Sequence, residues 1–321
     1  LDSRLQSIAE SSIMNSVRKN QAVLNNRLFE DEDEFSQLAY FGIFPEDTVR
    51  MMMEDSLPLY TELRDQLLVL TSLKALDPKT GTILAKVGGR PDYHDQYARA
   101  VQAGRQRGSV FNPFVYTTAI DNVYAVTKQL MNQPVALNVQ NANGEWEKWM
   151  PKNYDGSTGG LTTLREGLRK SLNLISVRLV QELVPAEEVK KTAQRMGITT
   201  KIRAVDAISL GTSEVYPIDI VSAYGVFANK GVYSKPMGIV RIEDRVGNII
   251  EEYESEQKEV LSEETAYLMT NLLQTVLDRG TGGSARWKYH FYHPAAGKTG
   301  TAAGKKTASS APREFAGQLR A

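Results

Sequence analysis

The stretch "GRQRGSVFNPFVY", residues 104–116, decides the fold assignment. It carries one serine, Ser109, which follows Gly108 where the segment turns apolar, at the expected start of a helix. Serine at such a position is most often a helix cap, because its oxygen accepts a hydrogen bond from a free backbone N–H group. The same free N–H groups and the helix dipole also favour negative charge, which would stabilise a serine alkoxide. This stretch alone is therefore compatible with a cap and with a nucleophile.

A second polar cluster, "KSLN" at 170–173, contains Ser171 and Asn173 at a junction between expected helices. Taken alone, this tripeptide of serine, leucine and asparagine carries almost no information. Its weight comes from its place between Ser109 and a third cluster further along the chain.

That third cluster is "GKTGT", residues 297–301, where Lys298 offers a cation and Gly300 leaves room for a ligand against the backbone. Thr299 and Thr301 add hydroxyl groups. The tripeptide "KTG" also occurs at 79–81, in a hairpin turn, so it is weak evidence by itself. The order of the three clusters is the informative feature.

Composition excludes several classes of function. The 321 residues include 38 Lys and Arg against 38 Asp and Glu, and this balance gives no electrostatic reason to bind nucleic acid. Cysteine is absent, which excludes disulfides, thiolate chemistry and Cys-based zinc sites. Only three histidines occur, without the H-E-x-x-H spacing, so we expect no metal site and no cofactor. No run approaches the roughly 18 apolar residues that would span a membrane.

The order of the expected elements predicts a mixed α/β (α+β) domain in which helices stack on a sheet. Pairs of strands with Pro or Gly turns are expected within 67–89 and 237–254, and a strand is expected to enter the third cluster. Helical sequence is expected at 2–25, 109–130, 161–197, 214–230 and 262–278. The segment 302–321 lacks any strand period, so we expect a poorly ordered tail and incomplete C-terminal strands.

The order of Ser109, "SLN" and "KTG" is that of the S-x-x-K, S-x-N and K-T-G motifs of penicillin-binding proteins and class A β-lactamases. The chain resembles the transpeptidase domain of class A, or bifunctional, penicillin-binding proteins. The resemblance extends to "ALDPKTGTILAKVGG", "YARAVQAGRQRGSVFNPFVYTTAI" and "WMPKNYDGSTGGLTTLREGLRKSLNLISVRL". It implies a penicillin-binding-protein/β-lactamase-like transpeptidase domain at 67–301, with an antiparallel sheet flanked by helices. An N-terminal helical linker or accessory segment would precede it at 1–66.

The resemblance implies acyl transfer through a serine ester. Ser109 would attack the D-Ala-D-Ala end of a peptidoglycan stem peptide, and β-lactams would acylate the same oxygen. The N–H groups of Ser109 and Thr301 would form the oxyanion hole. Ser171 and Asn173 would shuttle the leaving-group proton and bind the peptide. The implied substrate-binding set is Lys298, Thr299, Gly300 and Thr301.

The first cluster departs from the family pattern. The family places a lysine one turn after the serine, where its amine can take the hydroxyl proton. In this chain the motif reads "SVFN", with Asn112 at the lysine position. An amide has no useful basicity, and we expect its NH₂ group to donate to the Ser109 oxygen or to Asn173. Two hypotheses follow: a peptidoglycan DD-transpeptidase impaired at its base, or a non-catalytic module of the same fold that binds stem peptides or partner proteins.

A serine β-lactamase is the third alternative, disfavoured because nothing resembles the glutamate loop that drives deacylation. The chain begins with Leu1 rather than methionine, so we expect a piece of a longer polypeptide. The resemblance implies a membrane-anchored parent protein with an upstream glycosyltransferase domain, on the extracytoplasmic face of the bacterial inner or plasma membrane. Its implied partners are peptidoglycan stem peptides and β-lactams.

Overall fold

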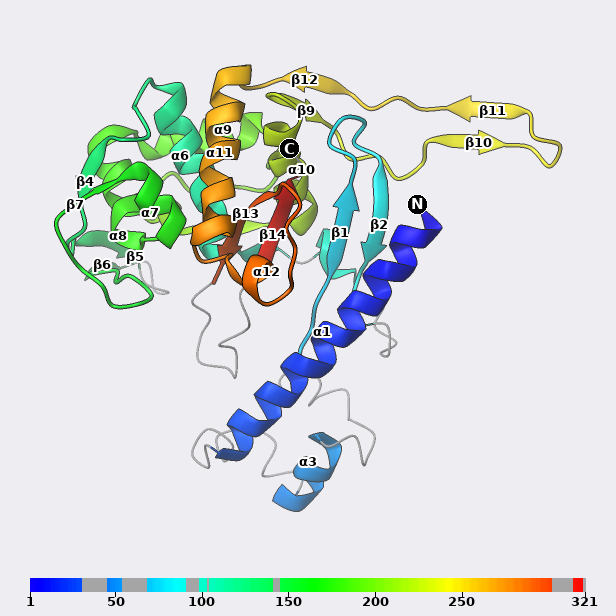
Figure 1. Ribbon diagram of the computed structural model, residues 1–321, viewed down its shortest axis with the longest axis horizontal. Helices are drawn as coiled ribbons and strands as arrows, with labels where there is room; N and C mark the ends of the chain where they lie inside the picture. Colours follow the sequence, from blue (N-terminus) through cyan, green and yellow to red (C-terminus); the bar gives the residue numbers. More distant parts are fainter. Residues whose placement is uncertain are drawn as a thin grey trace. The chain divides into compact units, whose positions relative to one another are not determined.

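The computed structural model describes residues 1–30, 45–53, 68–90, 98–102, 104–140, 145–301 and 314–319 (Figure 1). Helices and strands are mixed along the chain, which confirms the expected α/β (α+β) class. Two compact units share the described residues, one from 1–74 and 85–102, the other from 75–84 and from 103 onward. Among the described helices, none combines the length and the apolarity needed to cross a membrane.

The first unit contains the long helix α1, Ser3–Glu30, which confirms the helix expected at 2–25. The carboxylate of Asp2 caps it by accepting hydrogen bonds from the N–H groups of Arg4 and Leu5, at 2.9 and 3.0 Å. The amide of Gln6 bonds both backbone groups of Lys86 on strand β2, so α1 satisfies part of that strand. Short helices α3, Glu46–Met53, and α5, Arg99–Gln102, also belong to this unit.

Strands β1, Leu73–Leu76, and β2, Ile83–Val87, form the first expected hairpin. Asp77 begins the turn by accepting a hydrogen bond from the Lys79 N–H at 2.8 Å. The "KTG" at 79–81 therefore lies in a hairpin turn, as expected from its sequence, and is unrelated to the third cluster.

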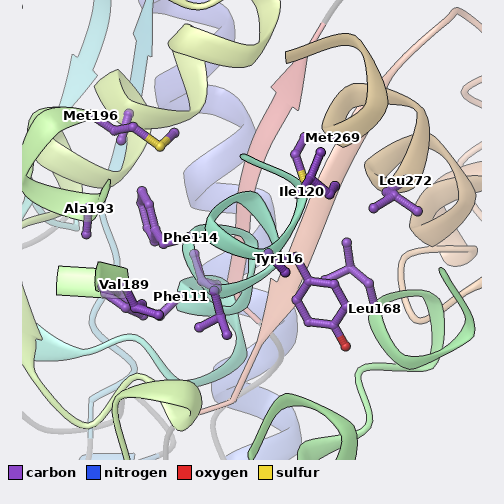
Figure 2. Close-up of a cluster of buried hydrophobic side chains, with 14 of the residues drawn as sticks. Phe111, Phe114, Tyr116, Ile120, Leu168, Val189, Ala193, Met196, Met269 and Leu272 are labelled. Carbon is purple, nitrogen blue, oxygen red and sulfur yellow. The ribbon is translucent and has the colours of Figure 1, made fainter. Parts of the chain in front are cut away.

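The core of the second unit surrounds helix α6, Asn112–Asp121, in which every residue from Asn112 to Ile120 is buried. Phe111, Phe114 and Tyr116 lie in this core with side chains of neighbouring helices, among them Leu168 and Met269 (Figure 2). The helices packed around it are α7, Leu164–Lys170; α8, Asn173–Arg178; α9, Ala186–Arg195; α10, Pro217–Ala228; and α11, Glu263–Arg279. A π-helical segment, Leu179–Leu183, continues α8.

Two of the long helical expectations were wrong in extent. The segment 109–130 is a 3₁₀ turn, η1, at Gly108–Phe111, followed by α6 and then by strand β4, Gln129–Met131. Strand β4 pairs antiparallel with β7, Leu161–Thr163, inside the second expected helical stretch. Both strands are too short to show a period of two, so the neighbouring helical pattern dominates the sequence signal.

The remaining strand pairs described below are also antiparallel and form two-stranded sheets. The expected second hairpin is confirmed as β10, Arg241–Glu243, with β11, Ile249–Glu252. The other pairs are β3, Arg105–Gln106, with β8, Glu214–Val215; β5, Leu137–Gln140, with β6, Trp146–Trp149; and β9, Val232–Ser234, with β12, Gln257–Glu259. Helices therefore surround the three sequence clusters, and short two-stranded ladders connect the loops between these helices.

The expectation that the segment 302–321 supplies no strand was wrong. Strand β14, Glu314–Leu319, pairs antiparallel with the third-cluster strand β13, Ala296–Gly300, where we expected no partner strand. A buried strand must pair its backbone N–H and C=O groups, and such pairing uses the main chain of the partner more than its side-chain pattern. The domain limits at 66/67 and 301/302 remain predictions.

Candidate active site

Ser109 lies in the 3₁₀ turn η1 and is half-buried. The N-cap residues of η1 and α6 are Arg107 and Phe111, and neither helix start has a side-chain capping hydrogen bond. Pro113 in the first turn of α6 needs no N–H partner, so that helix begins without a serine cap. The capping interpretation of Ser109 is therefore wrong, since its hydroxyl caps neither of these helices.

The turn that carries Ser109 is fixed from two sides. The buried Arg107 donates through Nε to the carbonyl of Val215 at 3.1 Å. The hydroxyl of Tyr224 donates to the carbonyl of Val110 at 2.7 Å, and burial raises the pKa of Tyr224 well above its ordinary value, which keeps the phenol a donor. These contacts hold the backbone of the turn while leaving the Ser109 side chain out of the network.

The Asn112 side chain makes no hydrogen bond to Ser109 or Asn173 in the described residues, contrary to our expectation; only its backbone N–H donates to the Ser109 carbonyl. Its side chain is 0% exposed, and Nδ2 donates to the Oγ atom of Ser176 on α8 at 3.1 Å. Asn112 Oδ1 is buried without a hydrogen-bond partner among the described residues. The amide at the family's lysine position therefore bonds across the α6–α8 interface, and neither of its polar atoms serves the serine.

The next turn of α6 adds a second polar group to this interface. The Tyr116 hydroxyl is buried and makes no hydrogen bond of good geometry within the described residues, although the Ser176 hydroxyl lies near enough to oppose the rise of its pKa. Burial raises the pKa of Tyr116, so the phenol stays protonated and cannot act as a base near neutral pH. Neither the Asn112 amide nor the Tyr116 phenol can thus take up a proton near neutral pH.

The second cluster is shaped by the end of α7. Ser171 is the C-terminal cap of that helix and has left-handed backbone angles, φ 57° and ψ 47°, which non-glycine residues rarely adopt. Asn173 is the first residue of α8, and its Nδ2 donates to the carbonyl of Lys152 at 2.9 Å. The structure therefore places Ser171 at a sharp change of chain direction, in a conformation that costs energy and that often marks a functional site.

The third cluster joins the second through Lys298. This lysine is 0% exposed, and its Nζ donates to Ser171 Oγ at 2.7 Å and to the carbonyl of Thr299 at 2.9 Å. A buried ammonium with an oriented hydroxyl beside it can hold an anionic group and relay a proton. Residues 127 positions apart in sequence thus form one polar unit.

Gly300 brings the same strand against the serine turn. A Cβ atom at Gly300 would lie 2.4 Å from Val110 Cγ2 and 2.8 Å from the Arg107 carbonyl, so only glycine permits this approach. All three predicted clusters therefore converge: β13 contacts η1 on one side through Gly300 and the end of α7 through Lys298.

Sequence reasoning missed Thr281 and Ser176. The hydroxyls of Thr281 and Thr299 lie 2.6 Å apart, and the Thr281 N–H donates to the carbonyl of Arg169 at 3.3 Å. Thr299 is buried and engaged in this contact, whereas Thr301 is exposed. The glycine-flanked "GTGG" at 280–283 was the only sequence signal for Thr281, and no pattern signalled Ser176.

A comparison with protein families matches residues 71–317 to the penicillin binding protein transpeptidase domain. The chain belongs to this family. Relatives include penicillin-binding protein 1A of Aquifex aeolicus, which is 36% identical over 230 residues covering 72% of this chain and 31% of that protein. Penicillin-binding protein 1A of Neisseria meningitidis is 33% identical over 245 residues, covering 74% of this chain and 30% of that protein. These matches support the class A resemblance.

Solved structures show the same fold. Penicillin-binding protein 1A from Haemophilus influenzae superposes with a TM-score of 0.67 at 25% identity, over 74% of this chain and 40% of that one. Penicillin-binding protein PonA1 from Mycobacterium tuberculosis gives 0.61 at 22% identity, over 74% and 62%. The chain spans only about a third of the length of its curated relatives, 30–31%. It carries a penicillin-binding transpeptidase domain, a class of cell-wall synthesis proteins.

Proposed function

We propose that the chain is a peptidoglycan DD-transpeptidase domain whose acylation step is strongly impaired because Asn112 stands in place of the base. In the full reaction Ser109 Oγ attacks the carbonyl carbon of the penultimate D-Ala, the peptide bond breaks, and terminal D-Ala leaves. An amine of a second stem peptide then attacks the serine ester, which forms the cross-link and restores the hydroxyl.

The residues on the Lys298 side suit the later part of this reaction. The Lys298 ammonium and Ser171 hydroxyl, 2.7 Å apart, are suited to bind the terminal carboxylate and pass a proton to the leaving amine. The backbone N–H groups of Ser109 and Thr301 are the proposed oxyanion hole. Asn173 is proposed to bind the peptide. Thr299, held by its contact with Thr281, is proposed to support the binding of the terminal carboxylate by Lys298 and Ser171.

One observation supports impairment above all others. The Asn112 side chain is fully buried and bonded to Ser176, so the position of the family's base holds an amide that neither takes up a proton nor hydrogen-bonds the Ser109 side chain. Loss of a positioned base costs about 10²- to 10⁴-fold in rate. Acylation by substrate and by β-lactams should fall together, because both depend on the same nucleophile.

The second candidate is a non-catalytic module that binds stem peptides or partner proteins. The intact contact between Lys298 and Ser171 favours it, since an anion-binding group is retained where the base is absent. The two candidates differ in whether Ser109 forms a covalent bond.

Covalent labelling with a fluorescent penicillin tests the proposal. We expect faint labelling of the wild-type chain, none of Ser109→Ala, and labelling of Asn112→Lys about 10²- to 10⁴-fold faster than wild type. Circular dichroism of each variant checks folding. A folded Asn112→Lys chain that labels no faster than wild type would contradict the missing-base explanation, and the non-catalytic module would then be the better account.

For the whole protein we propose a membrane-anchored enzyme on the extracytoplasmic face of a bacterial inner or plasma membrane, with a glycosyltransferase domain upstream. This proposal rests on the class A relatives, of whose length the matched segment covers only 30–31%.

A further inference from the structure

The segment that leads from helix α12, Ser284–Trp287, into β13 exposes several aromatic side chains. Trp287 is 71% exposed, Tyr289 65% and Tyr292 71%. Aromatic side chains of this size are usually buried, because they remove a large apolar area from water. Three of them on one short segment indicate a binding surface, which we call the aromatic strip, residues 287–293.

The backbone of the aromatic strip is clamped by Arg286. Its guanidinium donates through Nε and Nη2 to Asp278 Oδ1 on α11, at 3.0 and 2.8 Å. Through Nη1 it donates to the carbonyls of Phe291 and His293, at 2.5 and 2.7 Å. Phe291 in turn packs against the buried side chains of Leu277, Ala285 and Ala295. The exposed rings therefore stand on a fixed loop, and a preorganised surface loses little conformational entropy on binding.

The strip is cationic as well as aromatic. Lys288 Nζ lies 5.6 Å from the centroid of the Tyr289 ring, and His290 Nδ1 lies 3.2 Å from the Tyr292 hydroxyl. The sequence from 284 to 301 contains no Asp or Glu. Asp278 pairs with Arg286, and within the part of the chain that the structure describes Lys288 makes no salt bridge, so its charge can complement an anionic ligand.

We propose that the aromatic strip binds the glycan strand of peptidoglycan and so presents the attached stem peptide to the neighbouring site. The apolar face of a sugar ring stacks on an aromatic ring, while the indole N–H and phenol O–H groups reach its hydroxyl and acetamido groups. Lys288 complements the carboxylates of the stem peptides. The choice of peptidoglycan as the ligand rests on the proposed function; the existence of a binding surface does not.

The chemistry of the strip favours a sugar over a lipid surface. Each exposed ring carries a polar atom, and the one ring without such an atom, Phe291, packs inward. Membrane interfaces also attract Trp, Tyr and Lys, so lipid binding is a defined alternative outcome. The strip runs directly into β13, the strand that carries Lys298, which couples a bound glycan to the candidate active site.

The test is binding of the whole chain to two probes: purified insoluble peptidoglycan, by co-sedimentation, and a soluble oligomer of β-linked N-acetylglucosamine, by calorimetry. We expect Trp287→Ala and Tyr292→Ala each to weaken binding about 3- to 10-fold. Tyr267→Ala is the matched control, because Tyr267 is 68% exposed on α11 and should leave binding unchanged. Circular dichroism confirms that each variant folds.

Equal binding by wild type and the strip variants would overturn the proposal, as would no binding by wild type. Binding to anionic phospholipid vesicles that Trp287→Ala abolishes, without glycan binding, would overturn it in favour of a lipid surface. The assay needs no acylation. A chain that binds glycan but takes no penicillin label in any variant therefore contradicts only the proposed function, and a labelled chain without glycan binding contradicts only this inference.

Discussion

The two sides of the candidate active site differ in whether their polar side chains hydrogen-bond each other. On one side, Lys298 and Ser171 come from distant parts of the chain and meet at 2.7 Å. On the other side, Ser109 and Asn112 are one turn apart, yet the amide turns away and bonds Ser176 at 3.1 Å. The side chains of two sequence neighbours therefore do not hydrogen-bond each other, whereas two residues far apart in the sequence do.

This difference shows that the two sides of the site are held by different kinds of contact. Asn112 is accommodated because Ser176 supplies an acceptor on the facing helix, so the helix packing does not depend on a lysine there. The Lys298 side depends on a strained Ser171 backbone and on Gly300, which no other residue can replace without a shift. We therefore expect substitutions on the Asn112 side to be tolerated and substitutions on the Lys298 side not to be.

The largest effect is expected on the Lys298 side. In the Asn112→Lys background, Lys298→Met should lower the rate of penicillin acylation by about 10²- to 10³-fold, because it removes a preorganised cation from the substrate carboxylate. The rate is measured by fluorescent labelling over time. An unchanged rate would mean that the pair of Lys298 and Ser171 has no part in acylation.

Gly300→Ala should be the next largest change. The added methyl group meets Val110 and the Arg107 carbonyl, and relieving the overlap should cost about 2–3 kcal/mol of unfolding free energy. Gly238→Ala is the matched control, since its Cβ meets nothing within 4 Å and should change stability by less than about 0.5 kcal/mol. Urea denaturation measures both, and equal effects would refute the close approach of β13 to the serine turn.

The Asn112 side gives a pair of smaller, opposite effects. Ser176→Ala removes the one partner of the Asn112 amide and should cost about 1–2 kcal/mol, because a buried donor is left unpaired. Asn112→Leu removes the donor together with the unpaired acceptor, and should leave stability unchanged or raise it by about 1 kcal/mol. Denaturation that showed the same loss for both variants would contradict the orphaned state of Asn112 Oδ1.

The smallest effect concerns α7, the helix that ends at Ser171. A hydrogen bond from Arg169 lowers the pKa of Glu166 below its ordinary value of 4.5. The resulting stabilisation is present above that value and is lost as pH falls through the lower folded pKa. The melting temperature of Glu166→Gln should therefore lie below that of wild type at neutral pH, with a gap that closes in acid. A gap that persists at pH below the folded pKa would assign the effect to packing.

Much of the fold was predictable from local pattern. The helix expected at 262–278 is α11 at Glu263–Arg279, with Ser262 as its cap, and both expected hairpins are present. The β4–β7 and β5–β6 ladders were missed, because strands of three or four residues show too little alternation to be recognised. Strand β14 was missed because its pairing depends on the backbone groups of the buried strand β13, which need a partner, and not on a side-chain pattern of its own.

Within the site, the sequence by itself determined the chemistry available. It named Ser109, Ser171 and Lys298 in order, and it put an amide at 112, whose lack of basicity is a covalent property that no packing changes. Only the tertiary structure decided which groups meet: the contact of Lys298 with Ser171, the approach of Gly300, and the turn of Asn112 toward Ser176. A buried polar atom takes its partner from whichever element packs against it, and that choice is made by the whole core.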